Sequence, residues 1–109
     1  MFHTLINLTP HTLNLVDDKG VVTAYPSAGV ARVMSETAHA GLFEQAMIPL
    51  TRVVYGVVQG LPPADPGVLY VVSAMVRTAV PHRSDVASPG DLLRDESGNV
   101  VGAKSLILN

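Results

Sequence analysis

Short runs of alternating apolar and polar residues, separated by turn residues, predict a chain built mainly from strands. Asp17-Asp18-Lys19-Gly20 is typical of a tight turn, with Gly20 suited to a positive φ. The runs on either side of this turn are therefore predicted to form a hairpin. The strands expected in this first part of the chain are Phe2–Leu8, Thr12–Val16 and Val21–Tyr25.

The middle of the chain gives a mixed pattern. Val30–Ser35 and Leu50–Val58 are rich in β-branched residues and predict strands, and Gly56 indicates a bulge or a close backbone approach. Between them, Glu36–Ile48 lacks a clean amphipathic stripe, so we expect a loop or a short helix there. The stretch Gln59–Gly67 contains three prolines and is expected to be a stiff loop within one domain.

The run Val68–Val72 is apolar throughout and predicts a buried strand. Ser73 follows at the position of an N-cap, so Ala74–Val80 is expected to form two helical turns, which Pro81 ends. A strand that leads into a short helix and a polar loop is a common scaffold for functional groups.

The last part of the chain predicts a second hairpin. Pro89-Gly90 is expected to turn the backbone, after which Asp91–Arg94 pairs with Val100–Lys104 across Asp95–Asn99. Leu106–Leu108 is apolar although it lies next to the C-terminus. We therefore expect this end to be held in the sheet or in an interface.

These elements predict a single domain over residues 1–109. The expected fold class is α+β, mainly antiparallel β. It would have about seven strands in a small sheet, barrel or sandwich, with one or two short helices.

Composition changes this picture in one respect. Hydrophobic residues make up 48% of the chain and charged residues only 15%, against about 25% charged residues in a typical domain. So few charges leave apolar surface exposed on a small domain, and such surface usually marks an interface. We therefore expect a homo-oligomer, the alternative being a monomer with a neutral polar surface.

Charge and cysteine content narrow the function classes. The net charge of -2 gives no broad basic field for long nucleic acids. The absence of cysteine excludes disulfides, thiolate catalysis and cysteine zinc sites, and it fits a reducing cytoplasm. No apolar run approaches the ~18 residues of a membrane span, so no membrane partner is expected.

The densest polar cluster follows the predicted helix and is the candidate site. Arginine suits phosphate or carboxylate groups, and histidine can donate to an anion near neutral pH. We expect these side chains to bind a small anionic ligand, with Arg83 exposed and dispensable for folding. The alternative is an ordinary surface pair of Arg83 with Asp85. The expected ligand-binding residues are His11, Arg77, His82, Arg83 and Asp85.

Two other chemistries are weaker hypotheses. His11, His82 and Asp85 would form a two-histidine, one-carboxylate metal set, but nothing in their spacing brings them together. Ser73 or Ser84 near His82 would allow a weak hydrolase, although no nucleophile motif is present. We therefore expect no catalytic residue, no metal and no cofactor.

Three segments carry a resemblance that covers nearly the whole chain. INLTPHTLNLV, VLYVVSAMVRTAVPHRSDVASPGDLLRD and GNVVGAKSL resemble a group of small, mostly uncharacterised proteins of tailed phages, prophages and plasmids. The resemblance implies a setting, the cytoplasm of an infected bacterium, in which such proteins often act as accessory or counter-defence factors.

Together these observations leave two main functional expectations. The first is a non-enzymatic, oligomeric accessory protein that captures a small anionic ligand such as a nucleotide derivative. The second is a structural or protein-interaction module with no small ligand.

Overall fold

The computed structural model of the protein describes residues 1–109 as eight strands and one short helix. The fold is therefore β-rich, as the sequence predicted. The elements in chain order are β1 (Thr4–Asn7), β2 (Leu13–Val16), β3 (Val22–Tyr25), β4 (Arg32–Phe43), β5 (Ile48–Gln59), β6 (Val68–Val71), α1 (Ala74–Ala79), β7 (Val86–Arg94) and β8 (Val100–Leu108).

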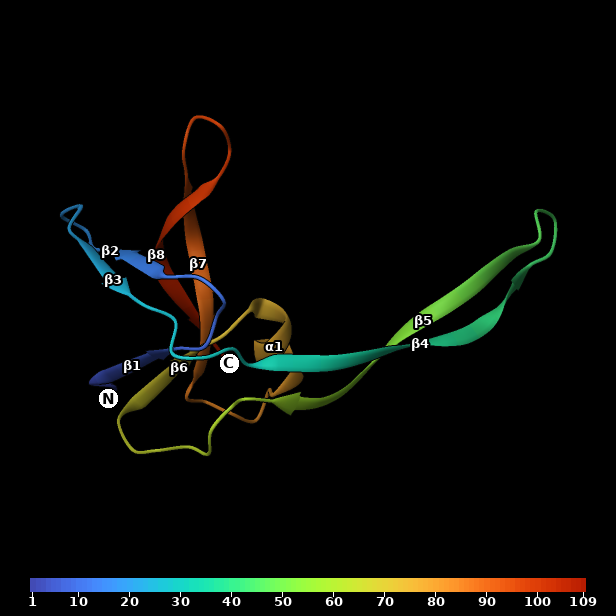
Figure 1. Cartoon of the computed structure of the whole chain (residues 1–109), viewed down its shortest axis with the longest axis horizontal. Helices are drawn as coiled ribbons and strands as arrows, with labels where there is room; N and C mark the ends of the chain where they lie inside the picture. The colour runs from blue at the N-terminus through green and yellow to red at the C-terminus, as the bar shows by residue number, and fades with distance from the viewer.

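Six strands form one mixed sheet in the order β1-β6-β7-β8-β2-β3 (Figure 1). The antiparallel ladders β2/β3 and β7/β8 are the two predicted hairpins. The parallel ladders are shorter, with four residue pairs in β1/β6, two in β6/β7 and one in β2/β8. The edge strands approach each other at one bridge between Asn7 and Ser27, which nearly closes the sheet into a barrel.

The core lies between β6 and α1. Val71 and Val72 are fully buried, as the apolar run predicted. The Ser73 hydroxyl accepts a hydrogen bond from the Val76 backbone N–H, so it is the expected N-cap, and Val76 is the buried residue of the helix. Burial is sparse elsewhere, since only 16 of 109 residues are buried.

The prediction of a turn at Pro89-Gly90 is wrong. Both residues lie inside β7, opposite Leu106 and Ser105 of β8. Glycine is needed at position 90 because the Ile107 side chain of β8 lies against it. A Cβ at this position would be only 2.8 Å from Ile107 Cγ1. The expectation for the C-terminal end is confirmed, since β8 continues through Leu108 in the sheet.

The loop or short helix expected over Glu36–Ile48 is wrong except at Glu44–Met47, which form a turn between two strands. The other residues of this stretch extend β4 and begin β5, and the two strands form a separate hairpin of twelve residues a side. We call this hairpin the arm (green in Figure 1). Its ladder contains the expected irregularity at Gly56, because Gly56 and Val57 together stand opposite Met34.

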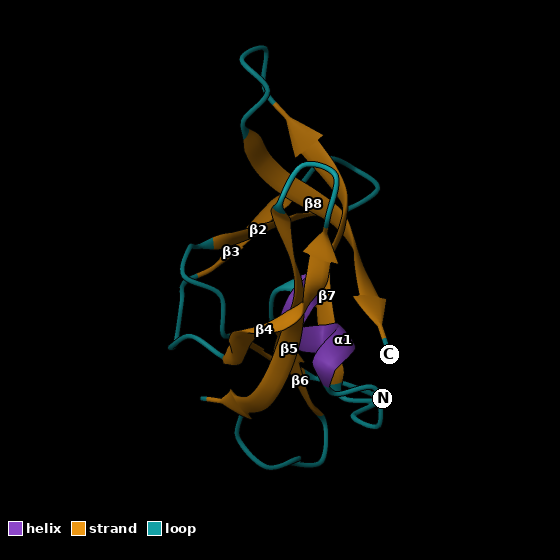
Figure 2. Ribbon diagram, turned by 90° about the vertical axis from the view of Figure 1, so that its right-hand side faces the viewer, coloured by secondary structure: helices purple, strands orange, loops and turns teal.

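The base of the arm is held by the core. Val33 and Val58 pack against the core cluster, and α1 lies against this end of the arm (Figure 2). Gly60 follows β5 directly, with a φ of 81°, and a Cβ on it would lie 2.5 Å from the Val30 carbonyl oxygen. The chain leaves the arm at Gly60, close to Val30 where it enters the arm. Only glycine can adopt this conformation without a clash.

The arm gives the molecule an extended shape. Its radius of gyration is 17.4 Å, whereas a compact domain of about 100 residues has about 13 Å. At about 3.3 Å per residue, twelve residues carry the tip roughly 40 Å from its base.

Gly60→Ala should lower the free energy of unfolding more than Gly98→Ala. The two glycines have nearly equal φ values, 81° and 84°, but nothing lies within 4 Å of a Cβ at Gly98. The left-handed backbone alone costs an alanine about 1–2 kcal/mol, so the contact with Val30 should add at least about 1 kcal/mol at Gly60. Urea unfolding measures both variants, and equal losses would contradict the close contact.

Candidate functional site

The predicted site residues Arg83 and Asp85 form a two-pronged ion pair. Arg83 Nε donates to Asp85 Oδ1 at 2.8 Å, and one terminal nitrogen donates to Asp85 Oδ2 at 2.9 Å and to the Pro62 carbonyl oxygen at 3.0 Å. The guanidinium carbon also lies 5.9 Å from the centre of the Tyr70 ring. Through Pro62, Tyr70 and Asp85, Arg83 thus connects the loop after the arm with β6 and with the residue directly before β7.

The expectation that Arg83 is exposed is wrong. The side chains of Arg83 and Asp85 are only 18% and 14% exposed. The hydrogen bond between them lowers the pKa of the Asp85 carboxyl and raises the pKa of Arg83, against the effect of burial. Such shifts accompany structural ion pairs as well as functional groups.

Arg77 also has partners within the protein. Its Nε donates to the Ser88 hydroxyl at 2.8 Å, and Nη1 donates to Asn109 Oδ1 at 3.3 Å. Asn109 in turn donates to the carbonyl oxygens of Arg77 and Val80, where α1 ends. The C-terminal asparagine therefore caps the helix, a role that nothing in the local sequence pattern indicated.

The side chain of Asn7 holds the backbone of His11 in place. The Asn7 amide is 2% exposed and donates to the carbonyl oxygens of His11 and Tyr25, both at 2.8 Å. Its carbonyl oxygen accepts from the Thr9 backbone N–H and hydroxyl. These hydrogen bonds hold the backbone of the Thr9-Pro10-His11 loop in a defined place.

His11 lines a groove of about 400 Å³ between β2, β7 and β8. No Asp, Glu, Lys or Arg side chain lines it, and its walls are apolar or neutral polar residues. We call this cavity the groove. It is lined by Thr9, His11, Thr12, Leu13, Asn14, Ser73, Pro89, Leu92, Val100, Val101, Gly102 and Ala103.

The structure does not bring the five expected ligand-binding residues into one cavity. His11 lies in the groove, whereas Arg77, His82, Arg83 and Asp85 line none of the four cavities. His82 is exposed next to the ion pair. No group of three His, Asp or Glu side chains gathers where a metal ion could bind, so the set His11, His82 and Asp85 is not assembled. Anion binding by these residues stays a prediction.

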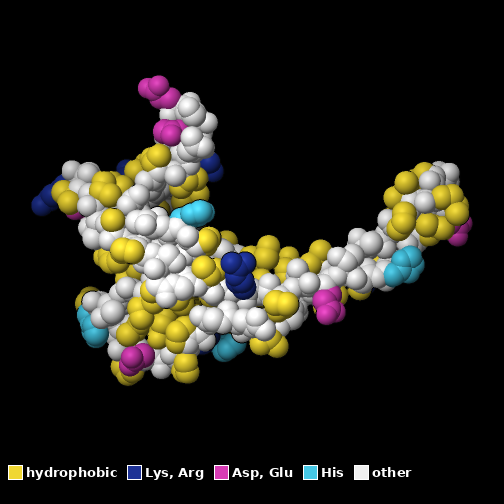
Figure 3. Space-filling model, viewed as in Figure 1, with side chains coloured by type: hydrophobic (Ala, Val, Ile, Leu, Met, Phe, Trp, Pro, Cys, Tyr) yellow, Lys and Arg dark blue, Asp and Glu magenta, His cyan; other side chains and the backbone are white.

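The most unusual surface is one that the sequence patterns did not single out. Nearly every residue of the arm beyond its base is exposed, including ten large apolar side chains. Figure 3 shows hydrophobic side chains clustered at the far end of the arm and again nearer its base, with few charges between them. The ten exposed residues are Met34, Leu42, Phe43, Met47, Ile48, Leu50, Val53, Val54, Tyr55 and Val57.

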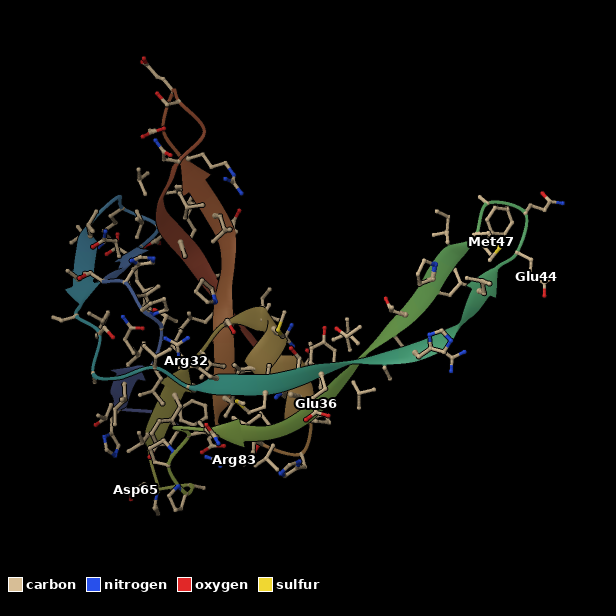
Figure 4. The ribbon with its side chains drawn as sticks, turned by 45° about the vertical axis from the view of Figure 1, so that its right-hand side comes forward. Arg32, Glu36, Glu44, Met47, Asp65 and Arg83 are labelled. Atoms are coloured by element: carbon tan, nitrogen blue, oxygen red, sulfur yellow. The ribbon has the colours of Figure 1, made fainter.

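The far end of the arm, Leu42–Leu50, is the densest part of this surface, and we call it the tip. Met47 is 70% exposed and has a φ of 54°, an unusual conformation for a residue with a side chain. Glu44, the only charged residue of the tip, lies beside it (Figure 4). The sequence signal for this surface was present in LFEQAMIPL, which combines high apolar content with one charge.

Comparisons of the chain with models of known protein families, with curated proteins and with solved structures give no match. The resemblance to small phage, prophage and plasmid proteins stays a prediction. The single helix has six residues, far fewer than a helix needs to cross a bilayer.

Arg83→Ala should destabilise the protein. The change removes three charge-assisted hydrogen bonds and leaves the Asp85 carboxylate half-buried without its partner. One such bond contributes about 1.5–3 kcal/mol, so a loss of about 2 kcal/mol or more is expected. Arg94→Ala is the control, because Arg94 is exposed and should change stability by only about 0.5 kcal/mol. Equal unfolding midpoints would restore the interpretation of Arg83 as a dispensable surface residue.

The contribution of Asp85 should depend on pH. Because its folded pKa is lowered, the stabilisation is fully present above the unfolded value of about 3.9 and is lost as pH falls through the folded pKa. The stability difference between the parent and Asp85→Asn should therefore be constant near neutral pH and shrink below about pH 4. Asp95, whose pKa is also lowered, titrates in both proteins and cancels. A difference that persists unchanged to pH 2 would contradict the ion pair.

Proposed function

We propose that the chain is a non-enzymatic, self-assembling interaction module, and that the arm is its interaction element. The supporting observation is the surface area. The chain exposes 7450 Å², whereas a compact monomer of 11.5 kDa exposes about 5,800 Å². A standard protein interface buries about 800 Å² on each partner, so the excess of roughly 1,600 Å² is enough for two such contacts.

The chemistry of the arm supports the same proposal. A two-stranded hairpin with no second layer is at best marginally stable in water, and this one presents apolar side chains along its length. Phe43 is 51% exposed and Tyr55 is 53% exposed, and aromatic residues are enriched at the energetic centres of interfaces. A partner that covers these side chains would both stabilise the arm and give it a function.

A second copy of the chain is the partner that the charges favour. The arm carries two arginines and two glutamates, so its formal net charge is zero. It therefore has little electrostatic repulsion from the arm, or from the rest of the chain, of a second copy. Figure 4 shows Arg32 and Glu36 towards the base of the arm and Glu44 at its tip. The four charged residues are Arg32, Glu36, Glu44 and Arg52.

Capture of a small anionic ligand receives less support. Arg77 and Arg83 already donate to groups within the protein, so an anion would have to displace those partners. The setting in a phage-infected bacterium rests on the sequence resemblance alone, and it is compatible with either function.

The protein should behave as an assembly, and Met47→Asn should weaken it. We expect light scattering to give a mass above the 11.5 kDa of one chain, decreasing on dilution. Asparagine tolerates the left-handed backbone of position 47 better than methionine does, so the variant should unfold at no lower temperature. Loss of an apolar contact of about 1.4 kcal/mol would raise the dissociation constant about tenfold.

Gln45→Ser is the matched control at the tip, because it leaves every apolar side chain in place and should assemble like the parent. A parent protein that stays at the mass of one chain over a hundredfold range of concentration would overturn the proposed function.

A further inference from the structure

We propose that the chains assemble head to tail, with the tip of one copy lying in the groove of the next. This inference rests on the proposed function and specifies its contact. It joins two surfaces, the exposed apolar tip over Leu42–Leu50 and the groove between β2, β7 and β8.

The groove suits an apolar occupant. Leu92 and Val101 line it and are 43% and 49% exposed, so each loses water contact when the groove is filled. The cavity measures about 400 Å³, and a cavity of about 150 Å³ holds a benzene ring. The groove therefore has room for about two side chains of the size of Phe43 and Met47. Its polar groups, His11 and Ser73 among them, can pair with backbone groups of the turn.

The tip cannot reach the groove of its own chain. The arm carries it roughly 40 Å from its base, and Figure 1 shows it projecting away from the end of the sheet that β2, β7 and β8 form. A contact between the tip and the groove therefore requires two chains. Because the two surfaces differ, the interface is heterologous, and each chain takes part in two contacts.

The area of the excess surface fits this arrangement. A standard interface buries about 800 Å² on each partner. A chain that contributes its tip and arm to one neighbour and its groove to the other would bury about twice that amount, which matches the excess of roughly 1,600 Å² over a compact monomer.

A mixing experiment with two full-length variants tests the contact. Phe43→Ser damages the tip and keeps the groove, whereas Val101→Glu places a charge in the groove and keeps the tip. Each variant alone should dissociate to single chains at concentrations where the parent is assembled, with a dissociation constant raised at least tenfold. Mixed in equal amounts, they retain one intact tip and one intact groove, so they should form a dimer of one copy of each.

Two controls separate this contact from folding and from general charge effects. Val22→Glu introduces the same charge at a valine of similar exposure, 57%, away from the tip and the groove, and should assemble like the parent. Circular dichroism and thermal unfolding should show that both test variants keep the fold, since Phe43 and Val101 are about half exposed.

The outcomes distinguish this inference from the proposed function. An assembled Val101→Glu variant, with no dimer specific to the mixture, would overturn the head-to-tail contact and favour pairing between two arms. If the parent itself is a single chain at every concentration, the proposed function fails as well. Dimers in the mixture, with single chains in each variant alone, are the result that we expect.

Discussion

The packing of α1 against the base of the arm is the contact on which the rest of the structure depends. Val76 is the buried residue of the helix, and the core around it takes side chains from the sheet, from α1 and from the arm. Val33 and Val58 are the last arm residues that reach this cluster. Beyond them the arm has no layer to pack against, so its direction is set entirely at its base. The entry and exit of the arm are held close together by the contact at Gly60.

Polar side chains in this protein serve mainly to satisfy the backbone. Asn7 holds the loop before β2, Asn109 caps α1, and Asp95 accepts hydrogen bonds from the turn between β7 and β8. Arg83 donates to the Pro62 carbonyl oxygen in the loop after the arm. No buried side-chain nitrogen or oxygen lacks a hydrogen-bond partner. Asn7 and Ser88 are the only buried polar residues, so most of these hydrogen bonds lie at or near the surface, beside the exposed apolar side chains.

This use of polar groups explains which sequence predictions succeeded. Hairpins and the capped helix were predictable because their signals are local, such as Gly20 in a turn or Ser73 before an apolar run. The parallel pairing of β1 with β6 joins residues more than sixty positions apart, and no local pattern specifies it. The pair of Arg83 with Asp85 spans two residues and was the stated alternative. The hydrogen bond from Arg83 to Pro62, 21 residues away, was missed because no local pattern specifies it.

The arm was missed because its residues do not follow a simple period. Strand alternation fails in β4 at Ala40, which has no partner between the pairs of His39 and Gly41, and in β5 where Gly56 and Val57 together stand opposite Met34. Each irregularity shifts the side chains to the opposite face of the hairpin. A hydrophobic pattern that changes phase once within each strand keeps neither a strand period nor a helix period along its whole length. The low charge content of the chain was the remaining signal, and it correctly indicated exposed apolar surface.

The same irregularities bear on how the arm meets a partner. A long, flat edge strand invites pairing with the edge of another chain, and bulges or prolines obstruct such pairing. The arm contains bulges at Ala40 and at Gly56, and Pro49 lacks a backbone N–H at the tip. Its backbone is therefore poorly suited to extend a neighbouring sheet, while its side chains remain fully available. Insertion of those side chains into an apolar groove is the mode of contact that this geometry favours.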